Sequence, residues 1–169
     1  VTEKAQAQER LKHAGLPSPL LGLGLGASRP TKSWPVEKYA DLAVRWVLQT
    51  QGSALALSGP GEAERGDAFL RAVEKALPKR VPDVDQRPAV RAKIRAEHRL
   101  GLREAAATLS ACAVFATNDS GPKHMAIAVG TPTVTLFGPE HPFEWHPYPV
   151  AQHPYLFIER LPCRKDAAP

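Results

Sequence analysis

Cysteine and long apolar runs are scarce in this sequence, and each shortage excludes a class of protein. The 169 residues include only two cysteines, Cys112 and Cys163, which cannot build a disulfide framework, so we predict a reducing, cytoplasmic setting. No apolar run approaches the roughly 20 residues that a bilayer-spanning helix requires. Residues 1–4 are polar and charged, and we predict no secretory signal there. With 43% hydrophobic and 23% charged residues, the composition is that of a globular domain.

The charge balance favours an anionic partner without naming it. The chain carries 22 basic and 17 acidic residues, a formal net charge of +5. This favours a phosphorylated small molecule, a nucleic acid or a membrane surface, although many domains carry such a charge without functional reason. The basic segment 79–100 lacks the interleaved aromatic residues that stack on bases. We therefore interpret it as a solvated helix face and predict no nucleic-acid partner.

Short apolar segments alternate with amphipathic ones along the chain. After a polar helix over 2–14, strands are predicted over 20–26, 54–57, 113–117, 133–137 and 155–158. Helices are predicted from Pro35 to Gly52, up to Pro78, and over 102–111 and 122–129, and segment 79–100 shows no clear pattern. Alternation of this kind predicts an α/β fold with a three-layer, Rossmann-like parallel sheet. Ligands of such sheets bind beyond the carboxyl ends of the strands, here the loops 26–34, 58–62 and 118–124.

The most informative loop is 118–124, Asn-Asp-Ser-Gly-Pro-Lys-His, between a predicted strand and a predicted helix. Asp119 or Ser120 can cap the helix, Pro122 fits its first turn, and Gly121 allows a ligand close to the backbone. Free amides at a helix start attract anions, and His124 can donate to a phosphate or a sugar hydroxyl. A plain capped helix explains the caps alone, whereas the whole string favours a binding site.

Three residues in the other two loops are candidates of lesser weight. Lys32 supplies a compact positive charge suited to a phosphate, and Ser28 supplies a hydroxyl near the strand end. Glu62 can accept hydrogen bonds from ribose hydroxyls, or it can interact with the dipole of its own helix. Taken alone, Lys32 is better explained as a solvated surface lysine, Ser28 is equally weak evidence, and the two interpretations of Glu62 are about equally supported.

Two other patterns suggest different functions. Residues 22–27 spell G-x-G-x-x-A, a partial dinucleotide fingerprint that would indicate a nicotinamide-dependent enzyme, but these glycines lie inside the apolar run and no helix follows at once. His141, Glu144, His146 and His153 could suggest a metal site, but they stand among prolines, and we expect a wet, irregular loop there. Trp145 and Tyr148 are expected to pack nearby or to line the mouth of a pocket.

Taken in order, the loop motifs resemble those of glycosyltransferase family 9, the lipopolysaccharide core heptosyltransferases. The motifs are Gly-Ala-Ser at 26–28, Lys-Ser-Trp-Pro at 32–35, Ser-Gly-Pro-Gly-Glu at 58–62, Asn-Asp-Ser-Gly-Pro-Lys-His-Met-Ala at 118–126, Gly-Thr-Pro at 130–132 and Phe-Gly-Pro at 137–139. The resemblance spans roughly residues 20–150. It implies the C-terminal half of a GT-B enzyme, with residues 1–19 as a linker helix and 20–169 as the domain that binds the nucleotide-sugar donor.

The same resemblance implies an inverting, metal-independent transfer of heptose from ADP-heptose to a lipopolysaccharide core acceptor, without a cofactor. It implies that the base and the acceptor site belong to an N-terminal domain, and that the enzyme works in the cytoplasm at the inner face of the inner membrane. The isolated chain is then expected to bind the donor without turning it over. A stand-alone nucleotide-binding module without transferase activity is the alternative. The donor-binding residues implied are Ser28, Lys32, Glu62, Asp119, Ser120, Gly121, Pro122 and His124.

Overall fold

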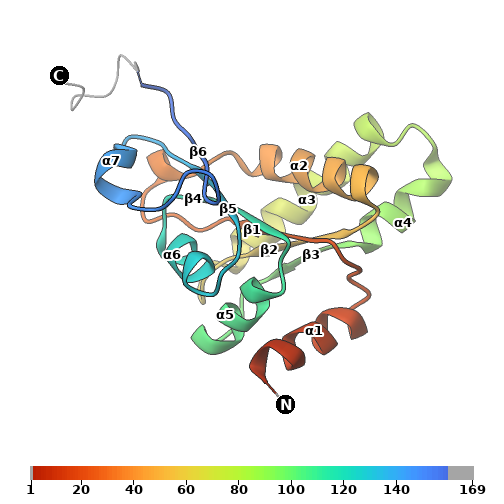
Figure 1. Cartoon of the computed structure of the whole chain (residues 1–169). Coiled ribbons are helices and arrows are strands. Elements are labelled where there is room, and N and C mark those ends of the chain that lie inside the picture. Colours follow the sequence, from red (N-terminus) through yellow and green to blue (C-terminus); the bar gives the residue numbers. More distant parts are fainter. Residues whose placement is uncertain (1, 160–169) are drawn as a thin grey trace.

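A six-stranded parallel sheet forms the centre of the chain. In the computed structural model, which describes residues 2–159, the strands run in the order β3-β2-β1-β4-β5-β6 with helices on both faces (Figure 1). The strands are β1 Leu20–Gly24, β2 Ser53–Leu57, β3 Ile94–Glu97, β4 Val114–Asn118, β5 Thr133–Leu136 and β6 Tyr155–Leu156. The predicted Rossmann-like α/β fold is confirmed.

The helices divide between the two faces of the sheet. They are α1 Glu3–His13, α2 Val36–Thr50, α3 Ala63–Arg80, α4 Arg87–Ala92, α5 Leu102–Ser110, α6 Gly121–Ala128 and α7 Pro142–Trp145, with single 3-10 turns at Pro30–Lys32 and Val84–Gln86. Helices α2 and α3 cover one face, while α1, α5 and α6 lie on the other (Figure 1). Because the side chains of a strand alternate between faces, β1 sends Leu21 and Leu23 towards α2 and α3, and Leu20 towards α1.

The largest core cluster lies between the sheet and the pair α2 and α3. Leu23, Tyr39, Phe69 and Ile94 are its largest members among the side chains that are completely or almost completely buried. Full burial of one such side chain stabilises the fold by about 1.5–3 kcal/mol. This face therefore holds the strands in register, and the register fixes the loops that leave their carboxyl ends.

The glycines of β1 allow close packing on the opposite face. A Cβ atom on Gly22 would stand 2.8 Å from Phe115, and one on Gly24 would stand 2.2 Å from the Thr117 hydroxyl. Both glycines lie within the strand, and the chain continues into a 3-10 turn rather than into a helix. The G-x-G-x-x-A string therefore serves packing between β1 and β4, and the dinucleotide interpretation has no structural support here.

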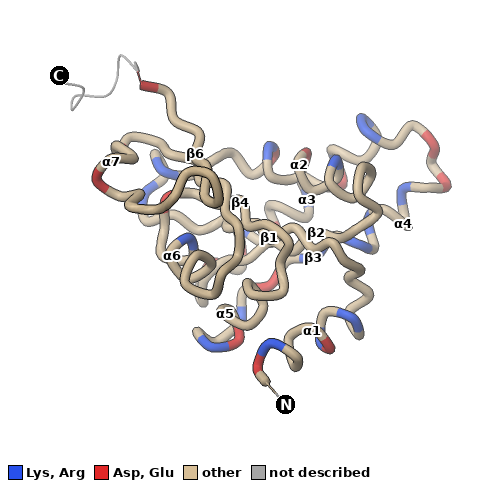
Figure 2. The backbone as a smooth tube through the Cα atoms, in the orientation of Figure 1, with Lys and Arg blue, Asp and Glu red and all other residues tan. Residues whose placement is uncertain are grey.

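The basic segment 79–100 contains strand β3, which the sequence pattern did not predict. It holds the end of α3, the turn at Val84–Gln86, α4 and β3. Arg80 pairs with Asp41 on α2, and Arg91 pairs with Glu74 on α3, so part of its charge joins helices to one another. Figure 2 shows both signs of charge around α3 and α4. The segment is thus a structural connection as well as a charged surface.

Several predicted boundaries were wrong by a few residues. Helix α2 begins after Pro35, which occupies the N-cap position, and ends at Gln51 in the left-handed conformation. Helix α3 continues past Pro78 to Arg80, although this exposed proline cannot donate a backbone hydrogen bond within the helix. Strand β1 ends at Gly24 rather than at 26, and β6 covers only two of the four residues predicted. Cys163 and the predicted domain end at 160–169 lie outside the described residues.

Candidate functional site

One pocket opens beyond the carboxyl ends of the central strands. It has a volume of about 770 Å³ and is lined by the loops that follow β1, β2 and β4, by the starts of α5 and α6, and by Trp145. These loops meet because β1 lies between β2 and β4 in the sheet. All the predicted donor-binding residues line this pocket: Ser28, Lys32, Glu62, Asp119, Ser120, Gly121, Pro122 and His124.

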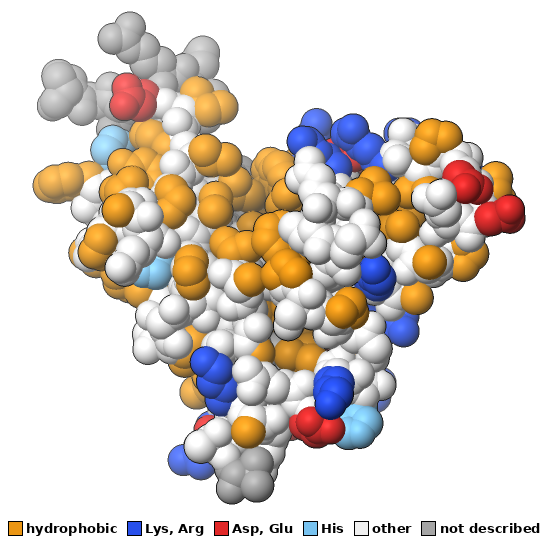
Figure 3. All heavy atoms as spheres, turned by 45° about the vertical axis from the view of Figure 1, so that its right-hand side comes forward, with side chains coloured by type: hydrophobic (Ala, Val, Ile, Leu, Met, Phe, Trp, Pro, Cys, Tyr) orange, Lys and Arg blue, Asp and Glu red, His pale blue; other side chains and the backbone are white. Residues whose placement is uncertain are grey.

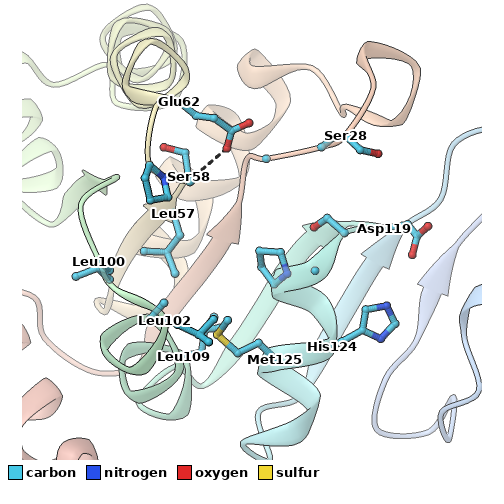
Figure 4. A pocket seen from close by; sticks show the side chains of 18 of the residues that line it. Ser28, Leu57, Ser58, Glu62, Leu100, Leu102, Leu109, Asp119, His124 and Met125 are labelled. Atoms are coloured by element: carbon cyan, nitrogen blue, oxygen red, sulfur yellow. Dashed lines mark hydrogen bonds between the residues drawn. The ribbon is translucent and has the colours of Figure 1, made fainter.

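The two sides of the pocket differ in chemistry. Polar side chains of Ser28, Asp119 and His124 lie on one side, and the Glu62 carboxylate lies at the top of the view (Figure 4). The other side is apolar and consists of Leu57, Leu100, Leu102, Leu109 and Met125. A ligand that suits the pocket therefore has an apolar or aromatic part and a charged or hydroxylated part.

Asn118 ties the first loop to the end of β4. It is completely buried, and its side-chain oxygen accepts a hydrogen bond from the amide of Trp34 at 2.9 Å. Its side-chain nitrogen lies 3.3 Å from the carbonyl oxygen of Gly26, to which it donates. Asn118 thus positions the loop that carries Ser28 and Lys32 next to the loop that carries Asp119.

The start of α6 offers the Gly121 amide to the pocket, because Pro122 has no N–H and the Lys123 amide donates to the Ser120 carbonyl at 3.1 Å. Ser120 occupies the N-cap position, but its hydroxyl donates to the carbonyl of Asn118 at 3.3 Å, and no side chain caps the helix. Pro122 stands in the first turn, as predicted, and a Cβ atom on Gly121 would meet nothing within 4 Å. An anion can approach this helix end without displacing a capping side chain.

A cluster of charged side chains surrounds Asp119. Its carboxylate oxygens lie 2.6 Å from Nζ of Lys123 and 3.3 Å from Nζ of Lys32. Glu140 lies 3.5 Å from the same Lys32 nitrogen and also pairs with Arg29. Three cationic groups thus face two carboxylates. Sequence reasoning assigned no role to Lys123, although Lys123 follows Asp119 by four residues, the i,i+4 spacing at which ion pairs form on helices.

Glu62 shapes the loop after β2 instead of pointing freely into the pocket. One carboxylate oxygen accepts from the amide of Gly59 at 2.8 Å, and the other lies 3.1 Å from Nε of Arg65 (Figure 4). A Cβ atom on Gly26 would stand 3.0 Å from this carboxylate. The carboxylate therefore closes the gap between the first two loops and still borders the pocket.

His124 lies at the rim, with Tyr148 as its partner. Its Nδ1 atom lies 2.5 Å from the Tyr148 hydroxyl oxygen. Burial, followed by the positive charge of Lys123, lowers the pKa of His124 below its ordinary value. The neutral imidazole is therefore favoured near neutral pH, with one ring nitrogen committed to Tyr148.

The segment with the remaining histidines is not the wet, irregular loop that was expected. Residues 142–145 form α7, and His146 and His153 are buried, with exposed fractions of 8% and 7%. Nε2 of His146 donates to the carbonyl of His153 at 2.7 Å, and Nδ1 of His153 lies 3.0 Å from the Thr133 hydroxyl. Within residues 2–159, no group of three or more His, Cys, Asp or Glu side chains could hold a metal ion.

Apolar side chains are exposed beside the pocket, around α7 and β6. Phe143 is 90% exposed, and Leu156 and Ile158 are each more than 60% exposed. Figure 3 shows hydrophobic side chains gathered on this part of the surface, next to the C-terminal end. Trp145 belongs to both regions, because it lines the pocket and is half exposed.

Comparison with known proteins agrees with the family resemblance of the loop motifs. The profile of glycosyltransferase family 9 (heptosyltransferase) matches residues 2–168. The chain belongs to glycosyltransferase family 9. Among curated family members, lipooligosaccharide heptosyltransferase 2 of Haemophilus influenzae is 34% identical over 125 residues, covering 73% of this chain and 32% of that protein. Lipopolysaccharide heptosyltransferase 2 of Salmonella typhimurium is 32% identical over 126 residues. This chain therefore spans about a third of the length of these relatives.

Solved structures of the family share the fold. Escherichia coli ADP-heptose lipopolysaccharide heptosyltransferase II superposes with a TM-score of 0.72 at 26% identity, covering 92% of this chain and 44% of that chain. A family 9 glycosyltransferase from Veillonella parvula gives the same TM-score at 28% identity, with 92% and 40% coverage. None of the helices within residues 2–159 is long and apolar enough to cross a membrane.

Proposed function

We propose that this chain is the donor-binding part of an inverting, metal-independent glycosyltransferase that moves heptose from ADP-heptose to a lipopolysaccharide core acceptor. One observation carries the proposal: residues from three separate loops, expected from the family's motifs to contact the donor, line one pocket. The names of the relatives support the reaction class, since they are heptosyltransferases that act on lipopolysaccharide or lipooligosaccharide.

The two sides of the pocket fit the two parts of a sugar nucleotide. The apolar side, with Leu102 and Met125, suits a nucleobase, and Glu62 borders the region between the sides, where a ribose would lie. Lys32 and the Gly121 amide at the start of α6 suit the diphosphate, because helix starts and ammonium groups both attract anions. Ser28 and His124 then face the phosphates and the sugar.

Charge development at the leaving group explains how such a site would promote transfer. As the bond between sugar and phosphate breaks, negative charge grows on the diphosphate. Lys32 and Gly121 line the pocket, and the lysine ammonium group and the Gly121 amide would stabilise this charge in the place of a metal ion. Loss of one preorganised donor of this kind commonly costs on the order of 10²–10³ in rate.

The acceptor and its activation are proposed to lie elsewhere. Because the chain spans about a third of its curated relatives, we expect the acceptor site and the base in a part of the protein beyond these 169 residues, namely an N-terminal domain. The chain alone would then bind the donor without transferring heptose. The complete enzyme would work in the cytoplasm, at the inner face of the membrane that carries the acceptor.

Calorimetric titration of the 169-residue chain with ADP, UDP and GDP tests the proposal. We expect ADP to bind most tightly and Lys32→Ala to weaken its binding. Lys75→Ala is the matched control, because Lys75 is an exposed lysine on α3 outside the pocket, and it should leave ADP binding unchanged. Failure of ADP to bind, or equal loss in both variants, would contradict the donor site. Heptose transfer by the chain alone would contradict the assignment of the base to another domain.

A further inference from the structure

Lys123 is a buried charge that the proposed donor site leaves unexplained. Its side chain has no exposed surface, although lysine is rarely buried completely. Nζ donates to Asp119 at 2.6 Å and to the carbonyl oxygen of Trp145 at 2.8 Å, and it lies 4.9 Å from the centre of the Phe137 ring. These contacts offset the desolvation of the ammonium group.

Stability alone is a poor reason for such a residue. A hydrophobic side chain of similar volume often serves as well as a buried ion pair, or better. Methionine is unbranched like lysine, only one atom shorter, and would fill most of the same space beside Phe137. The charge of Lys123 therefore calls for an explanation other than packing.

Position in the charged cluster supplies that explanation. Asp119 stands between Lys123 on its protein side and Lys32 on its pocket side. Glu140 is a second carboxylate at Lys32, and Arg29 pairs with Glu140. With Lys123 the five groups carry one net positive charge, and without it they would carry none.

We propose that Lys123 is a positioning residue that sets the charge of the pocket: it neutralises Asp119 from inside the protein, so that the positive charge of Lys32 remains available to a diphosphate. The same ammonium group donates to the carbonyl of Trp145. The side chain of Trp145 lines the pocket, and the centre of its ring lies 5.9 Å from Nζ of Lys32. Lys123 thus determines the net charge of the cluster and also holds in place Trp145, which forms part of the pocket wall. This inference rests on the proposed function, since it concerns binding of the donor diphosphate.

The charge effect can be separated from a structural effect by comparing ADP with adenosine, which lacks the phosphates. The measurement is the ratio of ADP affinity to adenosine affinity, determined by calorimetry on the 169-residue chain and on its Lys123→Met variant. We expect this ratio to fall about tenfold in the variant, because one charge is lost within about a Debye length of the diphosphate. Adenosine affinity should change little, and Lys75→Met on α3 should leave the ratio unchanged.

A second variant changes the net charge of the same cluster in the opposite direction. Glu140→Gln removes a carboxylate 3.5 Å from Lys32 while keeping an oxygen for Arg29. We expect it to raise the ratio of ADP to adenosine affinity, and this variant gives an answer even if Lys123→Met does not fold. A fall of the ratio in Glu140→Gln would overturn the inference.

The remaining outcomes distinguish the inference from the proposed function. If ADP binds but Lys123→Met leaves the ratio unchanged, or lowers both affinities equally, Lys123 has only a structural role and the inference is overturned alone. If the unaltered chain does not bind ADP, the proposed function fails and the inference fails with it.

Discussion

Substitution of Gly24 by alanine tests the packing between β1 and β4 on which the pocket depends. The new Cβ would stand 2.2 Å from the Thr117 hydroxyl oxygen and 2.8 Å from the Phe115 ring, well inside the usual contact distance of about 3.5–4.0 Å. Both neighbours have no exposed surface and so have little room to move. Overpacking of this kind costs about 1–3 kcal/mol. Alanine regains about 0.5–1 kcal/mol, because it loses less backbone entropy than glycine on folding.

The net expectation for Gly24→Ala is a loss of about 1 kcal/mol in the free energy of unfolding, because the cost and the gain differ by about 0–2.5 kcal/mol. With a urea dependence of about 2 kcal/mol per molar, the unfolding midpoint should fall by about 0.5 M. The same substitution in a Thr117→Ala background should cost less, because the closest atom is then absent. A midpoint for Gly24→Ala equal to that of the unaltered chain, or above it, would refute this account of the glycine string.

Two further substitutions address the site and its surroundings. Gly121→Ala should raise the urea midpoint slightly, since nothing lies within 4 Å of the new methyl group and alanine loses less backbone entropy than glycine on folding, yet it should weaken ADP binding on the order of tenfold by occupying the approach to the Gly121 amide; unaltered ADP affinity would contradict the phosphate position. Burial lowers the pKa of His146 in the folded chain below the unfolded value of about 6.5. As the pH decreases through this value, the unfolded chain binds more protons than the folded chain, so the free energy of unfolding should decrease as the pH decreases. Urea midpoints measured from pH 7.5 to 5.5, flattened in His146→Gln, would check this, and an identical slope in the variant would contradict it.

Local patterns were sufficient to predict most of the fold. The parallel sheet and the helices over 102–111 and 122–129 follow from short apolar runs, from capping residues and from the spacing at which apolar residues recur. All three are properties of residues that are neighbours in the sequence. Strand β3 was missed because its residues Ile94–Glu97 have one buried side chain followed by charged or small ones. An edge strand covered on one side lacks the apolar run that identifies the central strands.

The same reasoning explains what was missed in the site. Loop motifs were enough to bring eight residues to one pocket, because parallel strands place all their carboxyl ends at one edge. The roles of Asn118 and Glu62 in joining loops could not be read from spacing, since their partners Trp34 and Gly59 became neighbours only through the strand order and a local turn.

Lys123 shows most clearly where local reasoning ends. Its spacing from Asp119 predicts an ion pair of the kind found on exposed helix surfaces, which contributes little to stability. The pair differs from a surface pair because residues distant in the sequence bury it. The carbonyl of Trp145 on α7 accepts a hydrogen bond from the ammonium group, and the ring of Phe137 after β5 lies against it. Burial turns an ordinary surface pair into a fixed charge behind the pocket. Because the Trp145 carbonyl comes from a segment whose sequence indicated an irregular loop, the assignment of Lys123 required the structure.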